Sequence, residues 1–167
     1  MLTGDFAGEL FGAGQPLDAR RYFIILPDAI GAGQSSKPSD GLRMRFPHYN
    51  YDDMVRAQYR LVTEKFGIKR LVSVAGASMG GIQSIQWAVS YPDMVDSVIA
   101  QTPSARCAPW SAGIYTAGIN ILKADAAWDN GNYTEQPEKG WRAWANVILA
   151  LLANTPEGIK RVCPTPQ

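Results

Sequence analysis

A Gly-x-Ser-x-Gly sequence at residues 76–80 constrains the fold of this chain more than any other feature. The apolar run that precedes it, 70–75, is typical of a strand buried on both faces, and the residues that follow it have the pattern of a helix. A match to so short a sequence can arise by chance, but its place between a strand and a helix is specific. The pattern predicts a sharp turn that presents Ser78 as a nucleophile. The alternative is a glycine-rich turn with only a structural role.

Glycines on both sides of Ser78 fit such a turn. A serine held between a strand and a helix has strained dihedral angles, and the residues two before and two after it crowd one another. We therefore expect glycine to be required at Gly76 and Gly80, and Gly81 to let the helix approach the strand. The backbone N–H of Met79, at the start of the helix, would point at an oxyanion.

Predicted strands and helices alternate in the region before residue 104. Buried-strand patterns occupy 22–26, 70–75 and 95–100. A first helix is expected between Asn50, a good N-cap, and Gly67. Its apolar stripe is Val55, Tyr59, Val62 and Phe66, and that of the second helix, which ends near Tyr91 and Pro92, is Ile82, Ile85 and Val89. This alternation predicts an α/β fold with a three-stranded, mostly parallel sheet in residues 1–103.

Residues 104–167 have helical patterns without strands. We expect a helix over 114–127, a turn at 129–132 and a last helix marked by Trp141, Trp144, Ile148 and Leu151. This segment is expected to form a C-terminal helical layer that acts as a lid. Trp141 and Trp144 are candidates for lining an acyl pocket, and the alternative is that they form the core of the helical layer.

Charge and hydropathy exclude several classes of protein. Sixteen Lys and Arg against fifteen Asp and Glu give a net charge of +1 without a basic stripe, so we expect no nucleic-acid partner. The longest apolar run, 147–153, is far shorter than the roughly 20 residues of a membrane span. Asp5 and Glu9 interrupt the first residues, which do not resemble a signal peptide. We therefore expect a cytoplasmic protein without a membrane partner.

Cysteine and histidine set further limits. Cys107 and Cys163 form no Cys-x-x-Cys pair, so we expect two free thiols and neither a redox motif nor a zinc site. His48 is the single histidine, which excludes any metal site in this chain that needs two histidine ligands. We predict neither a metal nor a cofactor.

Several segments together resemble the α/β-hydrolase fold, and in particular its homoserine O-acetyltransferase branch and the esterase-like relatives of that branch. The segments that carry the resemblance are Leu2-Thr3-Gly4-Asp5, Pro16-Leu17-Asp18, Arg21-Tyr22-Phe23, the 76–81 turn, Tyr91-Pro92 with 95–100, Ser104-Ala105-Arg106, Trp128 and Gly131-Asn132-Tyr133. In that family the 76–81 turn is the nucleophile elbow. The resemblance implies Ser78 as nucleophile, the backbone N–H groups of Leu2 and Met79 as oxyanion donors, and a small ester or thioester as acyl substrate.

Two segments depart from the acetyltransferase pattern. The loop 28–35 looks like that of general α/β-hydrolases, where true homoserine acetyltransferases have a Gly-Gly-Cys form. Ala145 stands where those acetyltransferases tend to have an arginine for the substrate. The resemblance therefore implies acyl transfer through a serine, as an acyltransferase or an ester hydrolase, without implying homoserine as the acceptor.

The catalytic set that the resemblance implies is incomplete in these residues. The family places an acid and then a histidine after the serine, and no histidine follows Ser78. His48 precedes it, in a loop, and is expected to be a surface residue. The aspartates after the turn do not match the position of the family's acid, which lies beyond the lid; they are Asp93, Asp96, Asp125 and Asp129.

A strand is missing as well. The family places three strands before Leu2, and the third lies between the counterparts of 22–26 and 70–75. We therefore expect a partial α/β-hydrolase fold that self-associates or needs a complementing chain, since unpaired strand edges invite pairing. The alternative to an incomplete enzyme is a non-catalytic remnant or a subunit of a split hydrolase. The sequence gives only weak support to a nucleotide-binding domain, because Gly31 and Gly33 lack the third glycine of the dinucleotide motif and there is no Walker sequence.

Overall fold

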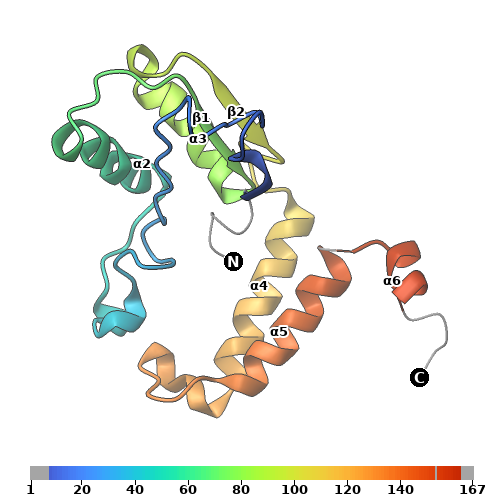
Figure 1. Cartoon of the computed structure of the whole chain (residues 1–167). Helices are drawn as coiled ribbons and strands as arrows, with labels where there is room; N and C mark the ends of the chain where they lie inside the picture. The colour runs from blue at the N-terminus through green and yellow to red at the C-terminus, as the bar shows by residue number, and fades with distance from the viewer. Residues whose placement is uncertain (1–7, 153, 163–167) are drawn as a thin grey trace. The chain divides into compact units, whose positions relative to one another are not determined.

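The structure, a computed structural model, describes residues 8–152 and 154–162. The chain divides into two units, Met1–Pro103 and Ser104–Gln167, which we call the core unit and the helical unit (Figure 1). In these described ranges, no helix combines the length and the apolar character that crossing a membrane requires.

A parallel pair of strands forms the sheet of the core unit. β1 (Val74–Ala77) pairs with β2 (Val98–Gln101) in register from one end to the other, and an isolated bridge joins Leu71 to Val95. The predicted strands 70–75 and 95–100 are therefore confirmed as parallel neighbours, but each continuous strand begins and ends later than expected. Between the bridge and the strands, the carbonyl of Val72 accepts from the Ser97 hydroxyl at 2.8 Å.

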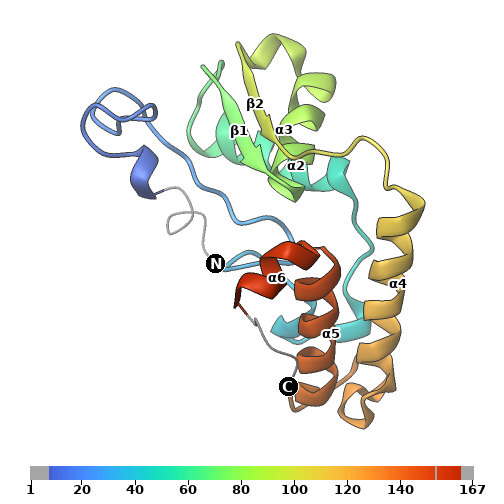
Figure 2. The same ribbon diagram turned by 90° about the vertical axis from the view of Figure 1, so that its right-hand side faces the viewer.

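The predicted strand at 22–26 is wrong. Residues 23–29 have no regular secondary structure, and the sheet of the described residues has two strands in place of the expected three (Figure 2). A strand is held by hydrogen bonds to a neighbour, and no described residue forms a neighbour for this segment. The Phe23 side chain is accordingly 73% exposed and meets the ring of Phe66 edge-on.

The first helix packs as the sequence predicts until its last turn. α2 (Tyr51–Arg60) begins with a capping box in which Asn50 and Asp53 bond each other's backbone N–H groups. Val55 and Val62 are buried in the core, but Phe66 is 44% exposed. The helix continues as a π-helical turn, Leu61–Lys65, whose extra residue rotates Phe66 out of the apolar stripe.

The second helix has the predicted extent but not the predicted buried face. α3 (Met79–Ser90) packs against both strands and against α2 (Figure 2). Ile85 and Val89, predicted to be buried, are 37% and 70% exposed. The buried residues are Gly81, Gln83, Ser84 and Trp87. At Gly81 the helix lies too close to the Gln101 backbone of β2 for any side chain.

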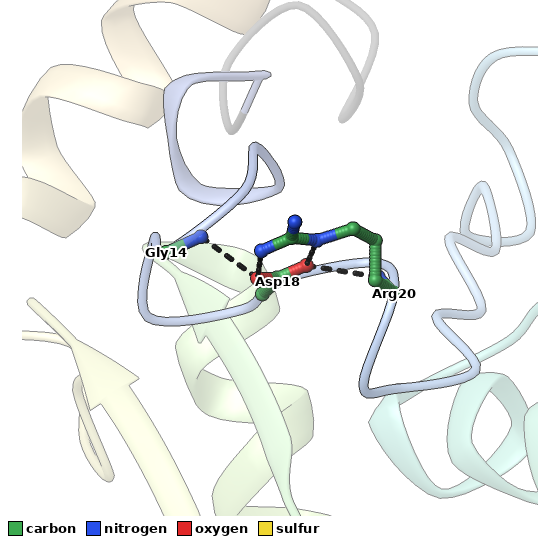
Figure 3. Close-up of polar contacts among 3 residues, drawn as sticks. All are labelled: Gly14, Asp18 and Arg20. Atoms are coloured by element: carbon green, nitrogen blue, oxygen red, sulfur yellow. Dashed lines mark hydrogen bonds and ion pairs between the residues drawn. The ribbon is translucent and has the colours of Figure 1, made fainter.

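A short loop near the start of the core unit is organised around one buried carboxylate. Asp18 is 3% exposed and accepts the backbone N–H groups of Gly14 and Arg20 and two hydrogen bonds from the Arg20 guanidinium (Figure 3). The guanidinium of Arg20, and then the N–H of Gly14, hold the pKa of Asp18 well below its usual range. The ionised carboxylate therefore fixes the conformation of this loop.

The helical unit is a helical hairpin followed by a short helix. α4 (Pro109–Ala124) and α5 (Glu138–Leu151) run antiparallel side by side, and α6 (Pro156–Val162) follows (Figures 1 and 2). The predicted helix 114–127 starts earlier, since Pro109 occupies the first helical position, where its missing N–H costs nothing.

The connection between these helices contains the predicted turn. A 3-10 segment, Ala126–Gly131, includes Asp129 and Asn130 at positive φ values of 42° and 52°. The Asp125 carboxylate accepts the N–H groups of Gly140 at 2.8 Å and Ala127 at 3.0 Å. These two bonds, that of Gly140 first, lower the pKa of Asp125.

Candidate active site

Ser78 occupies a strained backbone conformation between β1 and α3. Its φ and ψ are 52° and −118°, a region that residues with a side chain rarely adopt. Its N–H donates to the carbonyl of Gln101 at 2.9 Å, which ties the turn to β2. The residue is exposed, and its hydroxyl forms no capping bond to α3. The fold thus leaves Ser78 exposed, without a bond from its hydroxyl to its own helix.

The three glycines around Ser78 have different steric roles. A Cβ on Gly76 would lie 2.3 Å from the carbonyl carbon of Gly80, and one on Gly81 would lie 2.8 Å from the carbonyl oxygen of Gln101. Both positions therefore require glycine, and the expected close approach at Gly81 is confirmed. A Cβ on Gly80 would meet nothing within 4 Å apart from its chain neighbours and its own helix. The expectation that Gly80 must be glycine is wrong, because the crowding falls on the backbone of Gly80 and not on its Cα hydrogen.

The first turn of α3 presents backbone N–H groups beside Ser78. The first bond inside the helix runs from the Ile82 N–H to the Ser78 carbonyl at 3.0 Å, so the N–H groups of the preceding helical residues have no partner within the helix. These amides and the helix dipole favour negative charge at this end. Met79 is 39% exposed at this position, and its role as oxyanion donor stays a prediction. Leu2, the other predicted donor, lies outside the described residues.

A base and an acid for Ser78 are not found among the described residues. His48 is exposed in the loop before α2 and forms no hydrogen bond with Ser78. Asp96 is paired with Arg70, and Asp125 holds the backbone of the helical unit. The described residues contain no group of three or more His, Cys, Asp or Glu side chains that could hold a metal ion.

Trp141 and Trp144, the predicted pocket residues, lie together on α5. Their rings meet edge-on with centroids 5.5 Å apart. Trp144 packs against Gly118 of α4 so closely that a Cβ there would lie 2.4 Å from the indole Cδ1 atom, whereas Trp141 is 44% exposed. Trp144 is thus part of the packing between the two helices, and a substrate role for either ring stays a prediction.

Sequence reasoning missed a pair of glutamines next to the turn. Gln83 is 6% exposed on α3, and its side chain bonds that of Gln58 on α2. The positions of these glutamines in the sequence could have revealed the pair. Gln83 lies one helical turn after Met79, and Gln58 lies beside Tyr59 in the apolar stripe of α2. A polar residue at such a position must find a partner when the helix packs.

Comparison with known proteins identifies the fold. The family model described as alpha/beta hydrolase fold matches residues 7–139. The chain is 34% identical over 146 residues to a homoserine O-acetyltransferase of Corynebacterium urealyticum, and 37% identical over 141 residues to that of Carboxydothermus hydrogenoformans. These matches cover 80% and 78% of this chain but 37% of each enzyme, so the chain spans a little over a third of the length of these curated relatives.

Solved structures agree with this assignment. An acetylester hydrolase from Corynebacterium glutamicum superposes with a TM-score of 0.89 at 28% identity, over 97% of this chain and 48% of that one. A homoserine O-acetyltransferase from Bacillus anthracis gives a TM-score of 0.83 at 28% identity, over 95% and 46%. The resemblance to the acetyltransferase branch and its esterase relatives, and the partial α/β-hydrolase fold, are thereby confirmed.

Proposed function

Because the chain belongs to the α/β-hydrolase fold family, we propose that it carries the nucleophile of a serine acyl-transfer reaction, and that this nucleophile is Ser78. The observation that carries the proposal is the strained, exposed Ser78 between β1 and α3, with no capping bond from its hydroxyl to the helix and amides beside it that have no partner within the helix. A residue is held in such a conformation only where the surrounding structure enforces it, and such positions cluster at active sites.

The reaction would proceed through an acyl-enzyme. The Ser78 oxygen attacks the acyl carbonyl carbon of a small ester or thioester while a general base takes the hydroxyl proton. The N–H groups of Met79 and Leu2 would stabilise the oxyanion, and the alcohol or thiol leaves with a proton returned by the base. An alcohol or water then attacks the acyl group and frees Ser78. No cofactor enters these steps.

The general base and its orienting acid would come from outside these 167 residues. His48 is the only histidine in the sequence, and it is exposed and not bonded to Ser78. We therefore expect the purified chain to turn over an ester such as p-nitrophenyl acetate very slowly. Turnover at rates typical of serine esterases that Ser78→Ala abolishes would contradict this expectation.

The acyl acceptor separates two versions of the proposal. Similarity to homoserine O-acetyltransferases favours an alcohol, whereas similarity to an acetylester hydrolase favours water. Ala145, at the position where the acetyltransferases tend to have an arginine, favours water or an alcohol other than homoserine. Product analysis of a complemented preparation, with an acetyl ester and homoserine supplied together, distinguishes acetylhomoserine from free acetate.

Covalent labelling tests the nucleophile directly. We expect a fluorophosphonate probe to form one adduct, which peptide mapping places on Ser78, and lysate of the source cell to increase its rate by supplying the missing groups. Ser78→Ala should remove the adduct, and Ser39→Ala, at an exposed serine in a different turn, should leave it unchanged. Absence of an adduct in both conditions would favour the alternative, a non-catalytic remnant.

We also propose that the core unit self-associates through the unpaired edges of its sheet and the exposed apolar residues next to them. Along β2, Ile99 is 48% exposed while its neighbours are half-buried, and Val72 is 62% exposed just before β1. Exposed apolar residues next to unpaired strand edges favour pairing with another chain. Sedimentation velocity should show a dimer or larger species that Val72→Thr and Ile99→Thr weaken, with Val162→Thr as an exposed control in α6. A monomer at all concentrations would contradict the proposal.

A cytoplasmic location fits the free, exposed thiol of Cys107, since exposed thiols persist in reducing compartments. Fractionation of source cells with detection of the chain tests this, and recovery in a secreted fraction would contradict it.

A further inference from the structure

A chain of three hydrogen bonds runs from the centre of the core unit to the turn that holds Ser78. The indole N–H of Trp87 donates to Gln58 Oε1 at 2.8 Å, and Gln58 Nε2 donates to Gln83 Oε1 at 2.6 Å. Gln83 Nε2 then donates to the backbone carbonyl of Met79 at 3.4 Å. The chain therefore joins α2 to the first residue of α3.

The direction of this chain is fixed by the groups at its two ends. An indole N–H can only donate, so the Gln58 atom that faces it must be the carbonyl oxygen. The Gln58 amide nitrogen then faces Gln83, which must turn its own oxygen toward it and its nitrogen toward Met79. The carbonyl of Met79 can only accept, so the indole and each amide group of the chain donate one bond to the next acceptor.

Two members of the chain, Trp87 and Gln83, are buried, which makes it costly to remove the partner of either one. Trp87 is 3% exposed and Gln83 6% exposed, so an amide without its partner would be left away from water. An apolar side chain would fill the same space without this requirement. The two glutamines therefore indicate that the Met79 carbonyl requires an oriented hydrogen bond, and not only a side chain that fills the space.

The first turn of α3 has a reason to need such support. Gly80 and Gly81 follow Met79, and glycine has a low intrinsic preference for the helix. Two side chains bond the carbonyls of this turn: Ser84 Oγ donates to Gly80 at 2.8 Å, and Gln83 donates to Met79. Both bonds run back by four residues within α3, but Gln83 is itself bonded to Gln58 of α2, so its bond also links the turn to a second helix.

We propose that Gln83, oriented by Gln58, is a positioning residue that fixes the Met79 backbone next to Ser78, so that the oxyanion donor is aimed before substrate binds. This proposal rests on the proposed function, since it gives Met79 a catalytic purpose. Donors that are already oriented contribute more to the transition state than donors that must reorganise.

The experiment compares matched glutamine variants of the full chain. Gln83→Met and Gln58→Met break the chain with little change of volume, and the double variant tests whether both act through one route. Gln86→Met is the control, because Gln86 also joins α3 to α2 through Asp52 at 2.6 Å but lies farther along the helix from Met79. The two readouts are the Met79 amide signal in a ¹H–¹⁵N spectrum and the rate constant for fluorophosphonate labelling of Ser78.

We expect Gln83→Met and Gln58→Met to shift the Met79 amide signal and to slow labelling about tenfold, the equivalent of one buried hydrogen bond. The double variant should be no slower than the singles, and Gln86→Met should change neither readout. Gln83→Glu adds a rescue: its carboxyl still accepts from Gln58 but donates to Met79 only when protonated. Its labelling rate relative to the unaltered chain should therefore recover as the pH falls through the carboxyl pKa.

An unchanged Met79 signal in a folded Gln83→Met protein would overturn the positioning role, as would equal effects of Gln86→Met. If Ser78 of the unaltered chain takes no probe under any condition, the proposed function fails, and the Met79 signal alone decides whether Gln83 positions the turn.

Discussion

The carbonyl oxygen of Gln101 accepts the Ser78 N–H at 2.9 Å and lies where a Cβ on Gly81 would come within 2.8 Å of it. This one backbone oxygen of β2 therefore holds the Ser78 backbone in place and limits how closely the start of α3 can approach the strand. This relationship explains why position 81, in the first turn of α3, is a glycine.

Alanine substitutions at the neighbouring Gly80 and Gly81 should differ in their effect on the stability of the fold. Gly81→Ala places a Cβ 2.8 Å from the Gln101 oxygen, and we expect a loss of about 1–3 kcal/mol in the free energy of unfolding. Gly80→Ala meets no such contact and should be neutral or stabilising by up to about 1 kcal/mol. Urea unfolding measures both, and equal losses would contradict the steric assignment.

Replacing Ser78 by glycine should remove the nucleophile and relieve the backbone strain of the turn. Ser78 adopts a positive φ of 52° that glycine tolerates, so Ser78→Gly should stabilise the chain by about 1 kcal/mol relative to Ser78→Ala, which keeps the strain. Both variants should lose the fluorophosphonate adduct. Urea unfolding of the pair measures the difference, and no difference would show that the turn is unstrained.

The two glycines of α4 should also respond differently to alanine. Gly118→Ala must displace the Trp144 ring, and we expect a loss of about 1–3 kcal/mol with a change in tryptophan fluorescence. Gly113→Ala, in the same helix, meets nothing within 4 Å and should stabilise by up to about 1 kcal/mol. A loss at Gly113 as large as that at Gly118 would contradict the packing of α4 on α5.

Low pH should remove the contribution of Asp18 to the stability of the fold. Its folded-state pKa lies below the unfolded value of about 3.9, so its stabilisation is complete above that value and is lost as the pH falls toward the folded-state pKa. Asp18→Asn should lower the melting temperature at pH 7, and the gap to the unaltered chain should narrow below about pH 4. Asp93→Asn, at an exposed carboxylate, should have little effect at pH 7. A gap of constant size across the pH range would contradict the role of the ionised form.

The local features of the turn could be predicted from sequence, and the features that depend on distant contacts could not. Ser78 and Gly76 are recognisable because one short stretch sets their geometry. The segment 22–26 has the composition of a strand but lacks a neighbour to pair with, which composition cannot show. Ile85 and Val89 have helical spacing, yet α3 packs its Gly81 side against β2, where the Gln101 carbonyl lies, and leaves these two residues exposed. The π-helical turn that exposes Phe66 likewise follows from no residue pattern.

Trp87 has one further consequence. Of the five tryptophans, it is the single one before Pro103, and its indole N–H is engaged by Gln58 within the core. A fluorine atom introduced biosynthetically on every indole would thus give one resonance from the first unit and the rest from the second. That resonance is an internal spectroscopic reporter, with which melting of the unit around Ser78 can be followed separately from melting of the helices.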